Sequence, residues 1–377
     1  MAIEEIAKRL PDINFDIITP RYTRKLKKLE DLGNMRIYRV GCGWLGDKFI
    51  FPLAGFLKAR ELTKQNLVVE PLSTLSGSTT KYRNYMVAHA YQASYGAGAA
   101  WLFKLFNQQI KFTLTLQEGK DLDTQSWAVR FFRKLIIKKA DLITAISSYL
   151  KDYAHRINKK IRIVVIPNGV DVENFSKEYS YGELSELADR LGIKPGEKVI
   201  TSVSRLVPKN GIDILIEAFH VLNSKFKIQN SKLLIIGDGP EKKNLELQIS
   251  NLKLIGNVIF AGSVNHTDLP KYLKISDVFV RPSRSEGLGS AFLEAMVAGL
   301  PVIGTKVGGI PDFLKNKETG LFTKVDDPED LAEKINLILS NIELREKIIK
   351  NAKELVVQKY DWDKIAGEFR ELYSLNI

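Results

Sequence analysis

Several features that define whole classes of protein are scarce in this 377-residue sequence. It has one cysteine, Cys42, which excludes an internal disulfide framework and fits a reducing compartment. Its four histidines and single cysteine show no metal-ligand spacing, so we expect neither a metal nor a cofactor. No apolar run approaches the roughly 18 residues that span a bilayer, and the N-terminus lacks a secretory pattern. A cytoplasmic location is therefore expected.

The charge is unevenly distributed. Residues 1–168 hold 28 Lys and Arg against 14 Asp and Glu, a net charge of +14, whereas the remainder holds 28 against 30, a net charge of −2. The asymmetry indicates an anionic partner for the N-terminal half. The basic residues are scattered and accompany no known nucleic-acid-binding motif, so we expect no nucleic acid as that partner.

Strand and helix patterns alternate along the whole chain, which is too long for one ordinary core. Alternation over this length predicts an α/β fold with two Rossmann-like domains, one at 1–175 and one at 176–360, each with a parallel sheet. The buried strands are expected at FDIIT (15–19), FTLTL (112–116), LITAI (142–146), RIVVIP (162–167), KVITSVS (198–204), KLLIIG (232–237), NVIFAG (257–262), VFVRPS (278–283) and PVIGT (301–305).

Unusual residues follow the strands of the second half, at the sheet edge where ligands of such folds bind. Arg205 and Lys209 stand in RLVPKNG, ahead of a helix expected from Ile212, and Gly-rich turns follow the two later strands at DGP (238–240) and RSEGLGS (284–290). Glycines and a helix N-terminus present backbone donors to anions, so this edge suits a diphosphate. The alternative is that Arg205 and Lys209 are surface charges on a loop.

Two carboxylates stand in and before an unusually apolar helix, expected from near Leu288 to Gly299. Glu294 lies inside this helix, and a buried carboxylate must be paired or hydrogen-bonded. Two ribose hydroxyls would satisfy Glu294, while Glu286 would lie near the sugar beyond the phosphates. The alternative pairs Glu294 with a structural Lys or Arg and leaves Glu286 as a solvated loop acid.

These segments resemble the retaining glycosyltransferases of family 4 (glycosyl transferases group 1), which have the GT-B architecture of two Rossmann-like domains facing a central cleft. The spacing of Glu286 and Glu294, an acid, seven residues and an acid, reproduces the family's paired glutamates. The resemblance covers nearly the whole chain, and its signature segments occur in the family's order: VIPNGVDVENF, SVSRLVPKNGIDILIEAF, LLIIGDGP, EGLGSAFLEAMVAGLPVIGTKVGGIPDFL and YDWDKIAGEFRELY. The last would form a terminal helix (361–377) that packs back on the N-terminal domain.

The resemblance implies metal-independent transfer of a sugar from a nucleoside diphosphate sugar to the hydroxyl of a glycan or lipid-linked acceptor, with retained anomeric configuration. Arg205 would bind the diphosphate, Glu286 the donor sugar and Glu294 the ribose. Contacts to the donor are further implied for Gly239, Pro240, Gly287, Leu288 and Gly289.

The sequence departs from the family in two places near these residues. Where the family has Lys before the Gly of the RL…KG segment, this chain has Asn210, and Lys209 stands one residue earlier as a candidate substitute. Where the family often has a His after the strand at 112–116, this chain has Gln117, which cannot carry a proton charge. We expect Gln117 to contact the donor sugar and His89 to be structural.

Other classes of protein fit less well. A nicotinamide dehydrogenase would need G-x-G-x-x-G, and GDGPEKK lacks the third glycine. A glycoside hydrolase would need carboxylates on opposite sides of one bond, and Glu286 with Glu294 are not placed so.

Two basic segments bear on the anionic partner. RFFRKLIIKKA (130–140) mixes aromatic, aliphatic and cationic residues, and RKLKK (24–28) adds a second cluster. One hypothesis is peripheral attachment to the anionic inner face of the membrane. The other is an ordinary helix with a solvated charged face.

The beginning of the chain lacks a family feature. Ile3, Ile6, Ala7 and Leu10 predict an amphipathic helix over Met1 to Leu10, without the strand and Gly-rich turn that a family member would have before it. We therefore expect an N-terminal domain without its first strand, which would cost its neighbours their ladder partners. A truncated form is one hypothesis, which translation of the upstream nucleotides would test. Its rivals are another segment in the gap and a degenerate, non-catalytic nucleotide-sugar binder.

Overall fold

The computed structural model describes residues 2–44, 46–65, 87–119, 125–228 and 230–374. The chain divides into two compact units, the first comprising Met1–Glu118, Leu122–Ile166 and Ala366–Ile377, and the second comprising Gly119–Asp121 and Pro167–Ile365. The first boundary thus falls at Ile166, earlier than the predicted 175, because Pro167 and the residues after it pack with the second unit.

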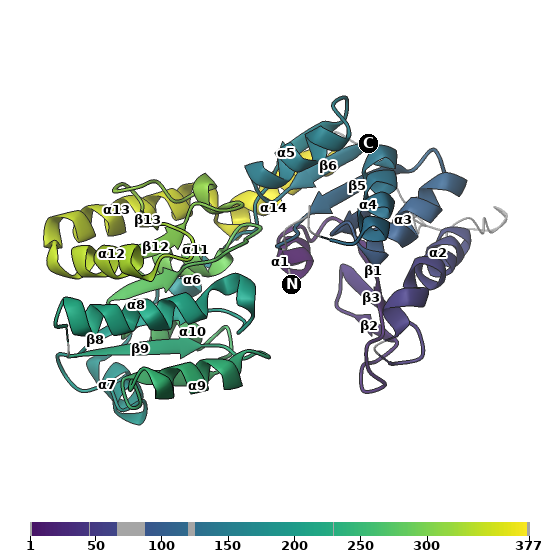
Figure 1. The fold of residues 1–377 in the computed structure, drawn as a ribbon. Coiled ribbons are helices and arrows are strands. Elements are labelled where there is room, and N and C mark those ends of the chain that lie inside the picture. Colours follow the sequence, from purple (N-terminus) through teal and green to yellow (C-terminus); the bar gives the residue numbers. More distant parts are fainter. Residues whose placement is uncertain (1, 45, 66–86, 120–124, 229, 375–377) are drawn as a thin grey trace. The chain divides into compact units, whose positions relative to one another are not determined.

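The N-terminal unit opens with helix α1 (Ala2–Arg9) and a three-stranded sheet of order β1-β3-β2 (Figure 1). Ile6, Ala7 and Leu10 are buried, which confirms the amphipathic helix. The strands of this part are β1 (Phe15–Pro20), β3 (Met35–Val40), parallel to β1, and β2 (Leu29–Asp31), antiparallel to β3, and its second helix is α2 (Asp47–Gln65). Of these strands the sequence predicted β1 alone.

A second, all-parallel sheet of the same unit has the order β4-β5-β6-β7. All residues of β5 after Lys111 are buried, since an inner parallel strand covered on both faces reads as a continuous run without alternation. The elements are β4 (Val87–Tyr91), α3 (Tyr95–Phe106), β5 (Lys111–Leu116), α4 (Trp127–Lys139), β6 (Leu142–Ala145), α5 (Ser148–Ile157) and β7 (Arg162–Val165).

Among the described residues, no ladder joins these two sheets, and β1 and β4 are each an end strand. Tyr373 contacts both: its ring lies 6.2 Å from that of Phe15 on β1, and its hydroxyl lies 2.9 Å from Nδ1 of His89 on β4. Tyr373 belongs to α14 (Trp362–Ser374), whose residues from Ala366 onward pack with this unit.

The second unit contains one six-stranded, all-parallel sheet of order β10-β9-β8-β11-β12-β13. The predicted strands are all present, and α8 begins at the expected Ile212. The elements are α6 (Val172–Phe175), α7 (Tyr181–Arg190), β8 (Lys198–Val203), the 3-10 turn η1 (Pro208–Asn210), α8 (Ile212–Lys225), β9 (Ser231–Ile236), α9 (Lys242–Asn251), β10 (Val258–Gly262), α10 (Leu269–Lys274), β11 (Val278–Arg281), α11 (Ser290–Val297), β12 (Val302–Thr305), η2 (Ile310–Asp312), β13 (Leu321–Thr323), α12 (Pro328–Ser340) and α13 (Ile342–Lys359).

The order of these strands fixes where a ligand binds. The chain moves outward from β8 through β9 to β10, and then returns to the other side of β8 with β11. The connections after β8 and β11 therefore run to opposite sides of the sheet, which opens a crevice at the carboxyl ends of these two strands. The loops that carry Arg205 and Glu286 follow these two ends.

Candidate functional site

The loop after β8 presents an exposed cation. Arg205 has no ion-pair partner among the described residues and is exposed, so its guanidinium is available to an anion. Asn210 is buried, and its Nδ2 donates to the Arg205 carbonyl oxygen at 2.7 Å. Asn210 thus holds the backbone of Arg205, while Lys209 lies half-buried in η1.

The loop after β11 holds Glu286 in a defined orientation. Its Oε2 forms an ion pair with the guanidinium of Arg281, a buried residue at the end of β11. Its Oε1 accepts from the Gly287 N–H at 2.9 Å. With 12% of its side chain exposed, Glu286 is not the solvated loop acid of the alternative hypothesis.

Helix α11 is apolar and buried, as predicted, and Glu294 lies at its accessible edge. Gly289 precedes the helix with φ +99°, and Gly299 follows it with φ +90°. Glu294 Oε1 lies 3.1 Å from Nε2 of the exposed His266, so its partner is neither a Lys nor an Arg. Glu294 keeps 14% of its side chain exposed, and its second oxygen faces no competing cation among the described residues.

Two glycines let the strand-end loops touch backbone to backbone. Gly211 has φ +68°, and a Cβ there would lie 2.1 Å from the Pro282 carbonyl oxygen. Gly308 has φ +53°, and a Cβ there would lie 1.7 Å from the carbonyl oxygen of Glu286. The loops after β8 and β12 therefore both pack on the loop after β11, and side chains at these glycines would push them apart.

The loop after β9 approaches the same place. A Cβ on Gly239 would lie 2.3 Å from the Leu206 carbonyl oxygen, so this glycine seats the loop against the residue after Arg205. Pro240 follows as an exposed residue. The six-stranded unit thus brings together the strand ends that carry Arg205, Gly239, Pro240 and Glu286.

Gln117 belongs to the other unit, just after β5. Its N–H donates to Oε2 of Glu118 at 2.9 Å, and Oε1 of Glu118 accepts from the Ala93 N–H at 2.7 Å. Burial raises the pKa of Glu118, which the nearby Arg133 guanidinium partly offsets. The buried Glu118 therefore fixes the backbone on which Gln117 stands.

His89 is hydrogen-bonded at both ring nitrogens, to the Tyr373 hydroxyl at 2.9 Å and to Thr115 Oγ1 at 2.6 Å. Burial lowers its pKa to about 3. It is a structural histidine, as expected.

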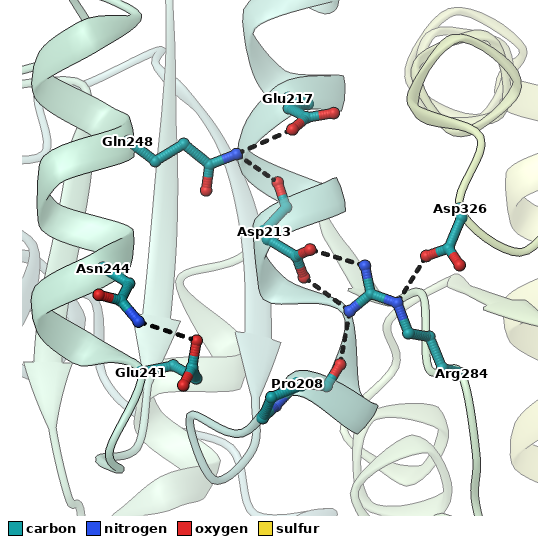
Figure 2. A network of polar contacts seen from close by, with 8 residues as sticks. All are labelled: Pro208, Asp213, Glu217, Glu241, Asn244, Gln248, Arg284 and Asp326. Carbon is teal, nitrogen blue, oxygen red and sulfur yellow. Dashed lines mark hydrogen bonds and ion pairs between the residues drawn. The ribbon is translucent and has the colours of Figure 1, made fainter.

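A polar network joins three loops of the second unit (Figure 2). The Arg284 guanidinium binds both carboxylate oxygens of Asp213, at 2.6 and 3.0 Å, and Oδ1 of Asp326 at 2.6 Å. It also donates to the Pro208 carbonyl oxygen at 2.5 Å. Gln248 Nε2 continues the network from α9 to Glu217 Oε1 and the Asp213 carbonyl oxygen, both at 3.1 Å.

The sequence reasoning missed Arg281, His266, Glu118 and Arg284. Arg281 gives a signal, because a cation at the end of the buried strand VFVR needs a partner. Arg284 gives none, since its partners lie 71 and 42 residues away.

No group of three or more His, Cys, Asp or Glu suited to a metal ion occurs in the part of the chain that the structure describes. No helix in that part is long and apolar enough to cross a membrane.

Two α/β units, with Gly-rich turns at the strand switch point of the second, form the arrangement in which parallel sheets bind ligands at the carboxyl ends of their strands. Sequence models of two families match the chain, Glycosyltransferase Family 4 over residues 2–174 and Glycosyl transferases group 1 over residues 185–355. The chain therefore belongs to the family 4 glycosyltransferases of group 1, as the sequence predicted.

The chain is 35% identical over 214 residues to an uncharacterized glycosyltransferase of Methanocaldococcus jannaschii, a match that covers 57% of this chain and 54% of that relative. It thus spans about half of that relative's length. It is 27% identical over 308 residues to N-acetyl-alpha-D-glucosaminyl L-malate synthase of Bacillus anthracis, with 80% of this chain and 78% of the relative covered.

Solved structures show the same fold at low identity. Sucrose-phosphate synthase from Thermosynechococcus elongatus superposes with a TM-score of 0.81 at 22% identity, over 99% of this chain and 92% of that chain. Anabaena HepE in complex with UDP and glucose superposes with a TM-score of 0.76 at 21% identity, over 99% and 95%. Together with the family, these likenesses give the chain the GT-B fold.

Proposed function

We propose that this protein is a retaining, metal-independent glycosyltransferase that moves a sugar from a nucleoside diphosphate sugar to an acceptor hydroxyl, for the synthesis of a cell-surface glycan or glycolipid. The observation that carries the proposal is the meeting of Arg205, the Glu286 loop and the N-terminus of α11 at the switch point of one parallel sheet. In the reaction, the bond from sugar C1 to the diphosphate oxygen breaks, C1 bonds to the acceptor oxygen, and the acceptor proton is released.

The leaving diphosphate needs stabilisation, which this edge of the sheet supplies. Arg205 and Lys209 provide positive charge, and Gly287, Leu288 and Gly289 bring backbone N–H groups to the N-terminus of α11. Fixed donors of this kind contribute on the order of 10²–10³ in rate each. We assign these groups the role that a metal has in other transferases.

The two glutamates contact different parts of the donor in this proposal. Glu286 accepts from sugar hydroxyls through the lone pairs that Arg281 and the Gly287 N–H leave open. Glu294 binds the ribose beside His266, with Gly239 and Pro240 against the nucleoside. Gln117, held by Glu118, contacts the donor sugar from the N-terminal unit.

The names of the relatives agree with such a donor. The HepE structures contain UDP with glucose, or UDP-glucose, and a Mycobacterium tuberculosis relative, 28% identical over 239 residues, is named a GDP-mannose-dependent phosphatidylinositol monomannoside mannosyltransferase.

Thermal-shift screening against UDP-, GDP- and ADP-sugars tests the donor, since a donor at 100 times its Kd stabilises the protein by about 2.7 kcal/mol. The selected donor is then incubated with glycan and lipid-linked acceptors, with and without EDTA, and the anomeric configuration of the product is read by NMR. Turnover that EDTA abolishes, or an inverted product, would contradict the proposal. Tight donor binding without any transfer would favour the non-catalytic binder.

We further propose that the N-terminal unit attaches to the anionic inner face of the membrane. Phe131 and Phe132 on α4 are 51% and 59% exposed and stand beside the exposed cations Arg130 and Lys134, while Ile136 and Ile137 form the buried face. Helix α3 packs against both α2 and α4. Exposed apolar side chains occur on all three helices: Phe49, Ile50, Leu53 and Leu57 on α2, Tyr95 and Phe106 on α3, and Trp127, Phe131 and Phe132 on α4.

Exposed aromatic and aliphatic side chains beside cations suit a lipid surface with negative headgroups. Sedimentation with phosphatidylglycerol vesicles in low and high salt tests the attachment. Phe131→Ser with Phe132→Ser should reduce binding, whereas Tyr181→Ser, an 84% exposed aromatic of the other unit, should not. A wild-type protein that stays in the supernatant at low salt would end the idea.

A further inference from the structure

We propose that Arg284 is a positioning residue for sugar transfer: it clamps the loop after β11, which carries Glu286, onto the loops after β8 and β13. That the clamp serves sugar transfer rests on the proposed function, whereas the contacts that form the clamp do not depend on it. Arg284 touches no expected part of the donor, so its effect passes through Glu286, two residues further along the chain.

The contacts of Arg284 reach each loop separately. Its guanidinium holds Asp213 in the first turn of α8 with two bonds, Asp326 ahead of α12 with one, and the Pro208 carbonyl oxygen with another (Figure 2). Its backbone N–H donates to the carbonyl oxygen of Lys209 at 2.7 Å. The residues expected to bind diphosphate and sugar are thus linked through one side chain and its own backbone.

A bidentate Arg–carboxylate pair fixes direction as well as distance, because the planar guanidinium donates two parallel bonds. Lysine, with a point charge, cannot reproduce this geometry. The pair is partly exposed, with 28% of the Arg284 side chain and 41% of the Asp213 side chain accessible, so solvent screens part of its contribution to the free energy of unfolding. What the bidentate geometry adds beyond stability is a fixed orientation of the loop after β11.

The packing of the same loops explains why the clamp is needed. At Gly211 the two loops meet through the Pro282 backbone and ring alone, because the glycine contributes no side chain to the contact. Without Arg284, we infer that the loop after β11 moves relative to η1 and that Glu286 loses its alignment. The diphosphate is also bound by Arg205, whose backbone Asn210 holds independently of Arg284, whereas the sugar contact depends on the alignment of the Glu286 side chain, so the sugar contact should weaken more.

Hydrogen exchange of the unliganded protein tests the clamp directly. In Arg284→Gln, the peptide that contains Gly287 and Gly289 should exchange at least tenfold faster than in the wild type, and Arg284→Lys should lie between them. Asp213→Asn leaves the bonds of Arg284 to Asp326 and Pro208 in place and should give a smaller change in the same direction, and the double variant should add little to Arg284→Gln. Lys225→Gln, which breaks an exposed ion pair with Glu329 of α12, is the matched control and should leave exchange unchanged.

Calorimetry with UDP, GDP and ADP and with UDP-glucose, GDP-mannose and ADP-glucose then separates positioning from a structural role. Arg284→Gln should keep the Kd of the nucleoside diphosphate within about threefold of the wild type. It should raise the Kd of the sugar derivative of the same nucleotide by tenfold or more, or lower kcat by that factor in the transfer assay. Unchanged exchange in Arg284→Gln would overturn the clamp, as would an equal loss for diphosphate and nucleotide sugar. Faster exchange in a protein that binds none of the six probes would contradict the proposed function and leave the clamp standing.

Discussion

Replacement of Glu294 by Ala should weaken nucleotide binding by about 10- to 150-fold. One carboxylate oxygen already lies 3.1 Å from His266, so the ribose gains one full bond from the other oxygen. A hydrogen bond to a charged group contributes about 1.5–3 kcal/mol, and each 1.4 kcal/mol is about tenfold in Kd. Because the pair with His266 lies at an exposed edge, the free energy of unfolding should fall by less than about 1 kcal/mol.

Isothermal titration calorimetry with the nucleoside diphosphate and its 2′-deoxy form measures this loss. The wild type should bind the deoxy form more weakly, whereas Glu294→Ala should bind both forms alike, because the lost hydroxyl and the lost carboxylate were partners. Wild-type affinity of Glu294→Ala for the full nucleotide would refute the ribose assignment. Equal discrimination against the deoxy form in both proteins would refute it as well.

Four further variants follow from the structure. Glu286→Gln should lower kcat by a factor of about 10²–10³ and leave the donor KM little changed. Glu286→Ala is a poorer test, because it leaves the buried Arg281 without its carboxylate and should lower the free energy of unfolding by about 3–5 kcal/mol. Arg205→Ala should weaken the diphosphate far more than the bare nucleoside, as titration of both would show. Gly211→Ala should lower Tm and diphosphate affinity, since φ +68° and the Pro282 oxygen exclude a Cβ, whereas Gly182→Ala, with nothing within 4 Å, should preserve both. His89→Gln should flatten the pH dependence of the free energy of unfolding, which urea unfolding would measure. Between pH 6.5 and about 3 only the unfolded chain protonates this imidazole, so as the pH is lowered the wild type loses up to about 1.4 kcal/mol of stability per pH unit.

Most of the strands and the family could be read from the chain alone, whereas β2, β3, β4 and β13 were not predicted. Runs such as KLLIIG and VFVRPS are buried on both faces of a parallel sheet, and this leaves a local apolar pattern. Glycine-rich turns and the spacing of Glu286 and Glu294 are also local. The start of α8 at Ile212 and the limits of α11 were predicted to within two residues because a turn or glycine precedes each.

The partners of the site residues depended on the tertiary structure. Arg284 meets Asp213 and Asp326 only because β11 lies beside β8 and the chain returns past β12 and β13. His266 reaches Glu294 from the loop after β10, and Arg281 turns Glu286 inward where the sequence allowed a solvated acid. Strand order decides such meetings, and it arises from packing between segments that are distant in sequence. A local pattern can predict that a buried charge needs a partner, and only the fold selects which one it meets.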